Sequence, residues 1–500
     1  MQMNGKKLGQ IVLLLGVVLV GKSAFATTYY VDFSSGNDSY SGTSKSDPWQ
    51  HAPGMYSCTA NCGAADPQPG DSFIFKGGVT WPNASFPITW KWSGTSSAPI
   101  YIGVDKTWYT GSSWTRPIWD AGGAPMNNLS STNQAFVNIN GYSYVIFDNF
   151  EMKGFNWNNN SITGGCIGTA GSTYITVENV YVHRWTHTGS ATASYFNCFY
   201  GDTNPPFALG SLLDHVVFDG SDSTNGGDSG AFTYAWPSVK YCVIHNTPNA
   251  LLLNGHGEVA YNLIYNIMTD FGGGHENAIE PLGGDGTLYV HDNVIHDIHG
   301  EAFFAGASPI VYAWNNLWYN LDGNPPGIDA RYNASTDYYF NNTIVPKSGG
   351  DCFNGHGGTY RPTVIVANNH CITTNPSIWS PTSNYNVRWI TNILMSPTTA
   401  ARQGYTSSET YAFSPAAGTN STVGAGTNLT SSWPSGYSTN DTTYACTEQT
   451  IFGVVQSVCP TRTAVARPSS GAWDVGAYAY ILNSGGPAPR PPTGLRAVVQ

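Results

Sequence analysis

A short pattern recurs through the middle of the chain, and it restricts the possible folds more than any other feature. A polar residue, most often Asn, precedes an aliphatic or aromatic pair. The pattern starts at Asn149, Asn179, His215, Cys242, Asn262, Asn293, Asn316, Asn342 and Asn369, at spacings of 20 to 36 residues. Short strand-like segments with no helical segment between them, repeated at this spacing, predict a parallel β-solenoid with one coil per repeat.

A second polar column follows the first by four residues. It comprises Asp219, Asn246, Asn266, Asp297 and Asn320. Asn side chains that recur at one bend can stack their amides from coil to coil and satisfy polar groups that a tight turn would bury. We therefore interpret both columns as structural.

Each coil also contains a second strand-like segment, such as 250–253, 278–281 and 302–305. Strand alternation predicts that its second residue points inward and its third outward. The predicted outward column is Thr233, Leu252, Glu280, Phe304, Asp329 and Asn354.

The two ends of the chain carry motifs outside the repeat. Residues 29–32 read Tyr-Tyr-Val-Asp, 36–39 read Gly-Asn-Asp-Ser, 69–71 read Pro-Gly-Asp and 473–478 read Trp-Asp-Val-Gly-Ala-Tyr. In these motifs the chain resembles the right-handed parallel β-helix proteins of the pectate-lyase-like superfamily. The resemblance implies an all-β, single-stranded right-handed parallel β-helix with an N-terminal capping segment. We expect cap and first coils over 27–130, the β-helix with irregular late coils over 131–480, and a Pro-rich tail over 481–500.

The first 26 residues have a basic start, a short apolar stretch and the small-residue pattern 24–26, as in a secretory signal peptide. We expect cleavage after Ala26, a secreted or periplasmic protein and no membrane span. Only 10% of all residues are charged, and removal of three lysines with the signal leaves 17 basic and 31 acidic residues. This excess of acid excludes nucleic acid as a partner.

Nine cysteines in an exported chain indicate an oxidising compartment with at least one thiol left over. Two local pairs, Cys58 with Cys62 and Cys446 with Cys459, each could close a small loop. The other five cysteines lie in the repeats, where we expect core filler. They are Cys166, Cys198, Cys242, Cys352 and Cys371.

Ionisable residues concentrate between His245 and Arg331. Glu280 and Asp329, two coils apart in the outward column, would have backbones roughly 10 Å apart. Their side chains could then reach the separation of about 6.5 to 9.5 Å used in inverting glycoside hydrolysis. Phe304 between them would desolvate a neighbouring carboxyl or stack on a sugar. Assisting groups are expected on the adjoining turn: Glu301, His275 and Glu276. The alternative is that both carboxylates are solvated surface residues.

The resemblance to pectate lyases implies a second chemistry, β-elimination on a uronic acid polymer, which uses a base and a cation. Arg331 is the candidate base or clamp. Asp219, Asp222 and Asp228 offer oxygen ligands for calcium on a turn-forming loop, although the turn propensities of these residues favour a plain turn. No cofactor is certain.

Aromatic residues complete the set of candidates. A sugar-binding platform is predicted from Tyr265, His296, Tyr319 and Trp318. The sequence thus favours cleavage of an extracellular polysaccharide, with hydrolysis ahead of elimination. A non-catalytic glycan-binding or adhesive protein remains the alternative. Substrate and oligomeric state stay open.

Overall fold

The computed structural model describes most of the chain from residue 26 to residue 481. The described ranges are 26–124, 133–157, 163–187, 196–201, 208–223, 230–268, 276–283, 286–305, 310–322, 327–329, 336–347, 349–356, 363–376, 379–380, 386–409 and 411–481. The expected signal peptide and most of the Pro-rich tail lie outside these ranges. Among the described residues, no helix is long and apolar enough to cross a membrane.

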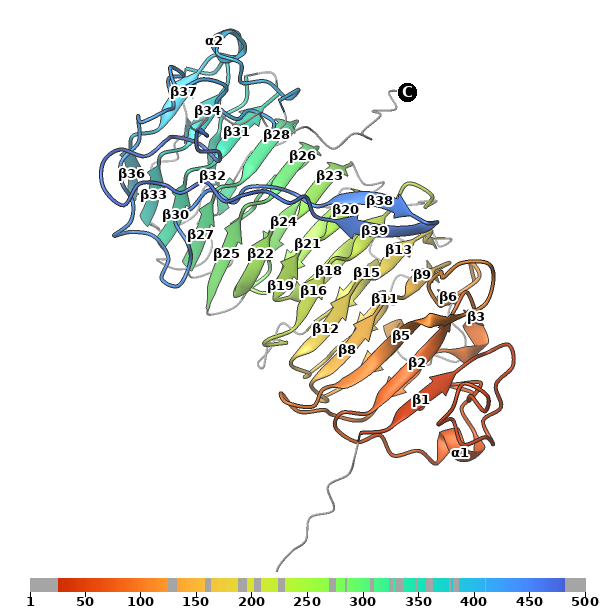
Figure 1. The fold of residues 1–500 in the computed structure, drawn as a ribbon. Helices are drawn as coiled ribbons and strands as arrows, with labels where there is room; N and C mark the ends of the chain where they lie inside the picture. The colour runs from red at the N-terminus through yellow and green to blue at the C-terminus, as the bar shows by residue number, and fades with distance from the viewer. Residues whose placement is uncertain are drawn as a thin grey trace, which may run out of the picture.

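The chain winds into a parallel β-helix whose coils stack along one axis (Figure 1), which confirms the predicted fold class. Two long parallel sheets run along it. Sheet A contains β1 (Thr28–Val31), β2 (Ser72–Gly77), β5 (Ile100–Tyr109), β8 (Val145–Asp148), β12 (Ile175–Glu178), β16 (Leu212–Asp214), β19 (Ser238–Lys240), β22 (Gly257–Ala260), β25 (Thr287–His291), β27 (Ile310–Trp314), β30 (Thr336–Phe340), β33 (Thr363–Ala367) and β36 (Asn386–Ile390). Sheet C contains β3 (Thr80–Pro82), β6 (Ile118–Asp120), β9 (Glu151–Lys153), β13 (Tyr181–His183), β17 (Val217–Asp219), β20 (Val243–Thr247), β23 (Leu263–Ile267), β26 (Val294–Ile298), β28 (Leu317–Leu321), β31 (Thr343–Pro346), β34 (His370–Ile372) and β37 (Ile393–Met395).

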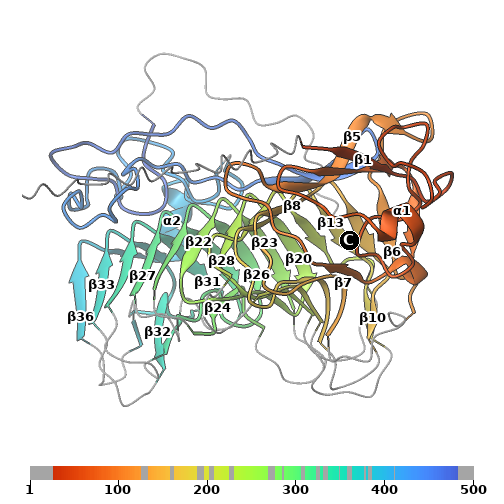
Figure 2. The same ribbon diagram turned by 90° about the horizontal axis from the view of Figure 1, so that it is seen from below.

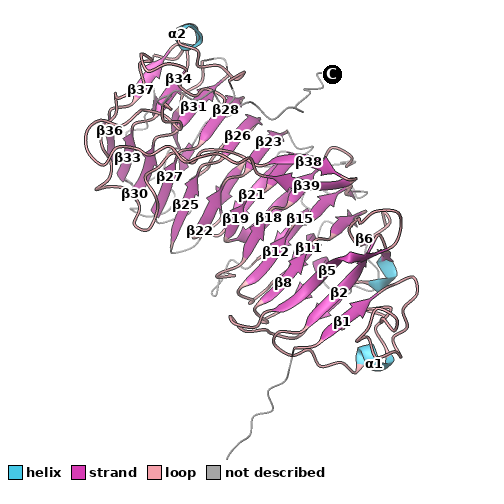
Figure 3. Ribbon diagram, viewed as in Figure 1, coloured by secondary structure: helices cyan, strands magenta, loops and turns pink. Residues whose placement is uncertain are grey.

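A third face completes each coil. Sheet B contains β4 (Ile88–Trp90), β7 (Asn133–Ile139), β11 (Thr163–Gly168), β15 (Phe196–Tyr200), β18 (Gly230–Trp236), β21 (Asn249–Leu253) and β24 (Ile279–Pro281). Three later strands take the same place in the coil order: β29 (Gly327–Asp329), β32 (Phe353–His356) and β35 (Trp379–Ser380). Minor pairs are β10 (Asn156–Trp157) with β14 (Thr186–His187), and the antiparallel hairpin β38 (Thr447–Ile451) with β39 (Val454–Val458). Helical turns are short: α1 (Ala60–Gly63), η1 (Asn83–Ser85) and α2 (Pro397–Arg402) (Figure 3).

The bend between sheets A and C explains the recurring asparagines. The second residue of the bend is an Asn in successive coils, and these residues form a ladder. The side-chain Nδ2 of each Asn donates to the side-chain Oδ1 of the Asn in the next coil at 2.9 to 3.0 Å. The members are Asn262, Asn293, Asn316, Asn342, Asn369 and Asn392. Each Asn also bonds to backbone groups of the bend that have no partner in the strands. The Cys242 N–H, for example, donates to Asn262 Oδ1 at 2.8 Å. The structural interpretation of these asparagines is therefore confirmed.

The predicted alignment of the repeats was wrong by one residue in its first three coils, which it started at Asn149, Asn179 and His215. Backbone hydrogen bonds from coil to coil place Phe150, Val180 and Val216 in line with Cys242 and the ladder. Asn149, Asn179 and His215 occupy the preceding position, where each has a positive φ. Asn is enriched at both positions for different reasons, because it tolerates left-handed backbone at the first and stacks its amide at the second.

The inward residues of the third face of the coils form the core as the alternation predicts. Phe232, Leu251, Ile279, Phe303 and Phe353 are all fully buried. The four residues of the second polar column from Asn246 to Asn320 have positive φ, so they make a second corner in their coils. Asp219 does not belong to that column, because it pairs with His245, one residue earlier.

Residues 403–409 and 411–481 leave the last coil and run back along the bend between sheets A and C as far as the hairpin β38–β39 (Figures 1 and 2), and the segment then returns to the late coils, where the Gly476 N–H donates to the Asn368 carbonyl. Arg467 donates to Asn315 Oδ1 at 2.7 Å, and Asn341 donates to the Asp474 carbonyl at 2.7 Å. A fully buried ion pair between Arg462 and Asp441 stiffens this segment. This segment is thus an ordered return that packs against the bends of the β-helix.

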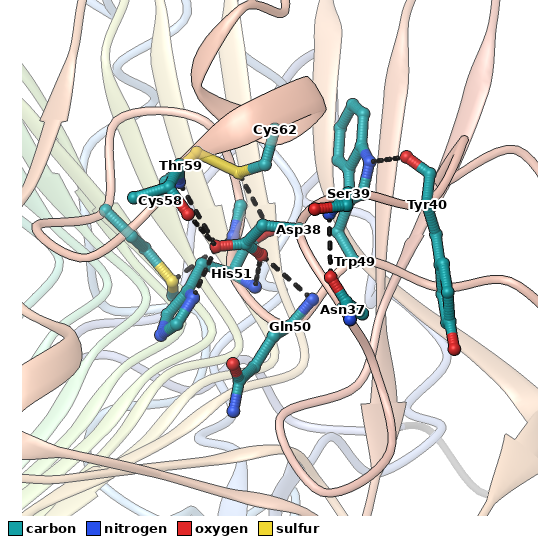
Figure 4. Close-up of a disulfide and its surroundings, with 12 residues drawn as sticks. Asn37, Asp38, Ser39, Tyr40, Trp49, Gln50, His51, Cys58, Thr59 and Cys62 are labelled. Carbon is teal, nitrogen blue, oxygen red and sulfur yellow. Dashed lines mark hydrogen bonds and ion pairs between the residues drawn. A yellow bond between two sulfur atoms is a disulfide. The ribbon is translucent and has the colours of Figure 1, made fainter.

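Four disulfides form. Cys58–Cys62 and Cys446–Cys459 confirm the two predicted local pairs. In Figure 4 the first lies beside Asp38, whose carboxylate accepts from the backbone N–H groups of His51 at 2.9 Å and Thr59 at 3.1 Å, which ties the N-terminal cap together.

The expectation that all repeat cysteines are core filler was wrong for four of five. Cys166 pairs with Cys198 and Cys352 with Cys371, since inward positions of successive coil segments bring their Cα atoms to 4.5 and 5.9 Å. Cys242 keeps a buried thiol.

Candidate functional site

Glu280 lies on the outer face of sheet B, next to Leu252 of the preceding coil. In the following coil the Phe304 N–H donates to the Ile279 carbonyl at 2.8 Å, which sets Phe304 beside Glu280. Two earlier coils contribute Tyr200 and Tyr234, whose rings stack at 5.2 Å. We call these five residues the outer row of sheet B: Tyr200, Tyr234, Leu252, Glu280 and Phe304.

Asn277 holds the Glu280 side chain in place. Its Nδ2 donates to Glu280 Oε2 at 2.8 Å, and the Asn277 side chain is 2% exposed. Its Oδ1 accepts from the Glu301 backbone N–H at 3.1 Å. One buried amide therefore links the Glu280 carboxylate to the backbone of Glu301 in the next coil.

Glu276 belongs to the same turn. The Gly300 N–H donates to the Glu276 carbonyl at 3.1 Å. A Cβ on Gly300 would lie 2.2 Å from that carbonyl oxygen, so only glycine permits the two coils to approach this closely. The structure therefore brings the backbones of Glu276, Glu280 and Glu301 together in adjoining coils.

The predicted outward column needs correction at both ends. Thr233 pairs with Leu251 rather than with Leu252 and is fully buried, so the predicted alignment of β18 was wrong by one residue and Tyr234 takes the outward position. Asp329 pairs with His356, whereas Asn354 pairs with Gly327 two residues earlier. Asp329 and Asn354 thus share a face but not a column.

Three predicted residues cannot be placed by their side chains. Asp329 is described by its backbone in β29, with no register to β24 among the described pairings. His275 and Arg331 lie outside the described residues. The separation of the Glu280 and Asp329 carboxyls, and the part of Arg331, therefore stay predictions.

The predicted aromatic platform has a different role. Along sheet C, His245, Tyr265, His296 and Tyr319 stack on one another at 4.6 to 5.2 Å. Phe413 covers the end of the stack at 5.5 Å from Tyr319. Ring faces that meet each other leave only edges for a ligand, so this stack is a structural ladder rather than a sugar platform.

Trp318 was wrongly predicted to bind substrate. It is fully buried and packs within the main hydrophobic core, since it occupies the inward position of β28. The sequence placed it one residue from Tyr319, and strand alternation sends these neighbours to opposite faces.

A second polar group lies on sheet C near the N-terminal end. The imidazole of His183 contacts Glu151 Oε1 at 3.2 Å and Asp222 Oδ2 at 2.7 Å. Burial alone would raise the pKa of Glu151, but hydrogen bonds from His183 and Lys153 outweigh it and lower the pKa to about 2. Burial alone would lower the pKa of His183, whereas its two carboxylate partners raise it. These groups neutralise one another as an ion-pair network.

Sheet A carries a similar network around Glu258. Lys240 contacts it at 2.5 Å and His291 Nε2 at 3.0 Å, while His291 Nδ1 meets Asp292 at 2.7 Å. Burial would lower the pKa of His291, but the bonds to Asp292 and Glu258 raise it. Tyr437 of the returning segment packs on His291, so this network is covered and supports the fold.

The predicted calcium ligands do not converge in the part of the chain that the structure describes. Asp222 is engaged by His183 and by the Arg184 N–H at 2.9 Å, toward the preceding coil. Asp219 lies between Tyr181 of the preceding coil, whose hydroxyl donates to it at 3.2 Å, and His245 of the next coil. Asp228 lies outside the described residues, so the full set stays a prediction.

Two residues that contact candidate site residues were absent from the predictions. Asn277 positions Glu280, and its only sequence signal is its location one residue after Glu276. Glu448 reaches His245 across 203 residues of sequence, at 2.8 Å. Its place between Cys446 and Cys459 indicated an ordered loop, but no local pattern could indicate which surface that loop meets.

No family model matches the sequence, and a search of curated proteins found no match. Solved structures with similar folds include a lacto-N-biosidase from Eubacterium ramulus, at 13% identity over 74% of this chain and 68% of that one, with a TM-score of 0.42. A pectate lyase is 14% identical over 91% of this chain and 97% of its own, with a TM-score of 0.41. A rhamnogalacturonan lyase is 13% identical over 75% and 86%, with a TM-score of 0.34. The parallel β-helix that the resemblance implies is the fold that the stacked parallel sheets of this chain show.

Proposed function

We propose that the chain is a secreted carbohydrate-active enzyme that cleaves glycosidic bonds of an extracellular polysaccharide along the outer face of sheet B. The observation that carries the proposal is Glu280. It is a carboxylate held by the buried Asn277 in a row of otherwise uncharged side chains. Charged residues are scarce in this chain, so one that is positioned by a dedicated amide is a strong candidate for chemistry.

Hydrolysis requires two carboxyl groups, one to protonate the glycosidic oxygen and one to attack the sugar or activate water. We assign Glu280 as one of them. Glu301 is the favoured second group, because Asn277 joins the Glu280 carboxylate to the Glu301 backbone through one amide. Asp329 remains the competing partner on the later strand of the same face.

The outer row also supports binding of a chain-like substrate. Successive coils place Leu252 and Phe304 beside Glu280, and Tyr234 stacks on Tyr200 in the two coils before them. Tyr200 and Tyr234 are half-buried, whereas Leu252 and Phe304 are 9% and 6% exposed, so a polysaccharide laid along the helix axis would meet chiefly the two tyrosine rings, which suit the apolar faces of sugars. Elimination on a uronic acid polymer is the second candidate chemistry, since the Glu280 region offers a base but its cation, Arg331, remains unplaced.

The test uses the mature protein on a panel of neutral and uronic-acid polysaccharides, with and without calcium. Reducing ends and the ultraviolet absorbance of unsaturated products are followed together. Reducing ends alone support hydrolysis, and both signals together establish elimination. Glu280→Gln should lower kcat by about 100-fold or more. Asp322→Asn, an exposed carboxylate paired with Lys347 at 2.9 Å, is the matched control.

A further inference from the structure

Three potential metal ligands meet where the hairpin β38–β39 lies on sheet C. Asp219 ends β17, His245 lies in β20 of the next coil, and Glu448 comes from β38. Their ligand atoms all lie within 4.8 Å of one another. His245 Nε2 is 2.8 Å from Glu448 Oε2, and His245 Nδ1 is 3.6 Å from Asp219 Oδ1.

The surroundings hold these groups in a fixed orientation. Asn246 Oδ1 lies 2.6 Å from His245 Nδ1, and Tyr265 stacks on the imidazole at 4.7 Å. Asp219 accepts from the Ser221 N–H at 2.8 Å and from the Tyr181 hydroxyl at 3.2 Å. Partners of this kind on the far side of a ligand fix its ring orientation and basicity in metal sites.

His245 is oriented by a neighbour on one side of its ring. Its Nδ1 lies against the Asn246 side-chain oxygen, which leaves Nε2 directed at Glu448 Oε2, 2.8 Å away. His245 and Asp219 have only 7% and 9% of their side chains exposed, so little water competes for their ligand atoms.

We propose that Asp219, His245 and Glu448 bind one divalent transition-metal ion, such as Zn²⁺, that fastens the returning C-terminal segment to the β-helix. One imidazole nitrogen and two carboxylate oxygens match the ligand preference of zinc, whereas calcium takes oxygen ligands. The site is separate from the outer row of sheet B, because its ligands come from sheet C and the hairpin. It does not depend on the proposed glycosidic chemistry.

The hairpin does not need the ion in order to dock. Cys446 packs on Val217 and Val243, and the Ser457 hydroxyl donates to the Tyr241 carbonyl at 2.6 Å. Variants of the ligands should therefore fold, which makes direct measurement of binding feasible.

The test titrates Zn²⁺ alone into untagged, chelator-treated protein by isothermal titration calorimetry, with the thermal unfolding midpoint recorded in parallel. We expect one ion per chain and a higher midpoint with zinc. Glu448→Gln and His245→Gln should each weaken binding by about 100-fold or more, and Tyr181→Phe by about tenfold through Asp219. Asp297→Asn is the control, since Asp297 contacts His296 at 2.6 Å in the same ladder and should leave binding unchanged.

Two results would overturn the proposal. One is the absence of zinc binding, or binding that survives unchanged in both ligand variants. The other is stoichiometric binding of Ca²⁺ without binding of Zn²⁺, which would exclude the transition-metal assignment. Circular dichroism of each variant confirms that lost binding does not reflect lost folding.

Discussion

Asp337 is a carboxylate inside the β-helix, and its removal should stabilise the protein in a pH-dependent way. It lies in β30 between Val311 and Val364 of the adjoining coils and is 1% exposed. Its Oδ1 makes no hydrogen bond to any residue that the structure describes. Burial raises the pKa of Asp337 from 3.8 to about 8, and the Val311 backbone offsets only part of that effect.

The raised pKa sets the sign of the effect. In the folded chain the carboxyl stays neutral up to about pH 8, whereas in the unfolded chain it ionises above its ordinary value of 3.8. Unfolding therefore releases a proton between these values, and stability falls as the pH rises through this window. Each unit of pKa difference corresponds to about 1.4 kcal/mol, so the loss between about pH 5 and about pH 8 is about 4 kcal/mol.

Denaturant unfolding at several pH values measures this loss. The free-energy difference between Asp337→Val and the wild type should grow by about 4 kcal/mol from about pH 5 to about pH 8. Asp337→Asn should lack the same pH dependence, although its amide remains buried. The exposed control Asp322→Asn should track the wild type. A difference between Asp337→Val and the wild type that is constant across this range would refute the reasoning.

Three further predictions address the fold and the site. Asn316→Ala removes the Oδ1 that accepts from the Asn293 N–H at 3.2 Å and should cost about 3 kcal/mol of unfolding free energy, well above the cost of Asn392→Ala at the ladder's half-exposed end; equal losses in chemical denaturation would argue against the ladder. Replacing both Cys166 and Cys198 by Ser should cost about 2 to 4 kcal/mol, and mapping of non-reduced peptides should find that pair in the wild type; free thiols at both positions would contradict it. Asn277→Asp should lower kcat on the cleaved polysaccharide by about tenfold or more, because a carboxylate replaces the amide that donates to Glu280 at 2.8 Å; unchanged kcat in initial-rate assays would remove Asn277 as a positioning residue.

The solenoid could be predicted from the sequence because its signals are local. Each coil repeats an Asn bend and an inward apolar residue, so one alignment identifies both the Asn262–Asn369 ladder and the buried position of Phe303. The alignment failed where two adjacent positions favour the same residue, as at Asn149. It also failed in β18, where Thr233 pairs with Leu251 instead of Leu252, so that Tyr234 and not Thr233 takes the outer position.

The site could be predicted only in part, for a related reason. Leu252 and Glu280 belong to successive strands, and their pairing follows from the repeat. Asp329 follows coils of unequal length, so small register errors accumulate before it. The contact between His245 and Glu448 depends on the course of the whole returning segment, which no local pattern specifies.

The initial rate of reducing-end release by the wild type, Glu280→Gln and Asp322→Asn, measured side by side on the polysaccharide panel, tests the central claim most directly. The account predicts cleavage by the wild type, an equal rate for Asp322→Asn, and a rate lower by about 100-fold or more for Glu280→Gln. Full activity of Glu280→Gln would contradict the assignment of the site. A wild type that binds polysaccharides on the panel without cleaving any of them would contradict the enzymatic function and favour a glycan-binding protein.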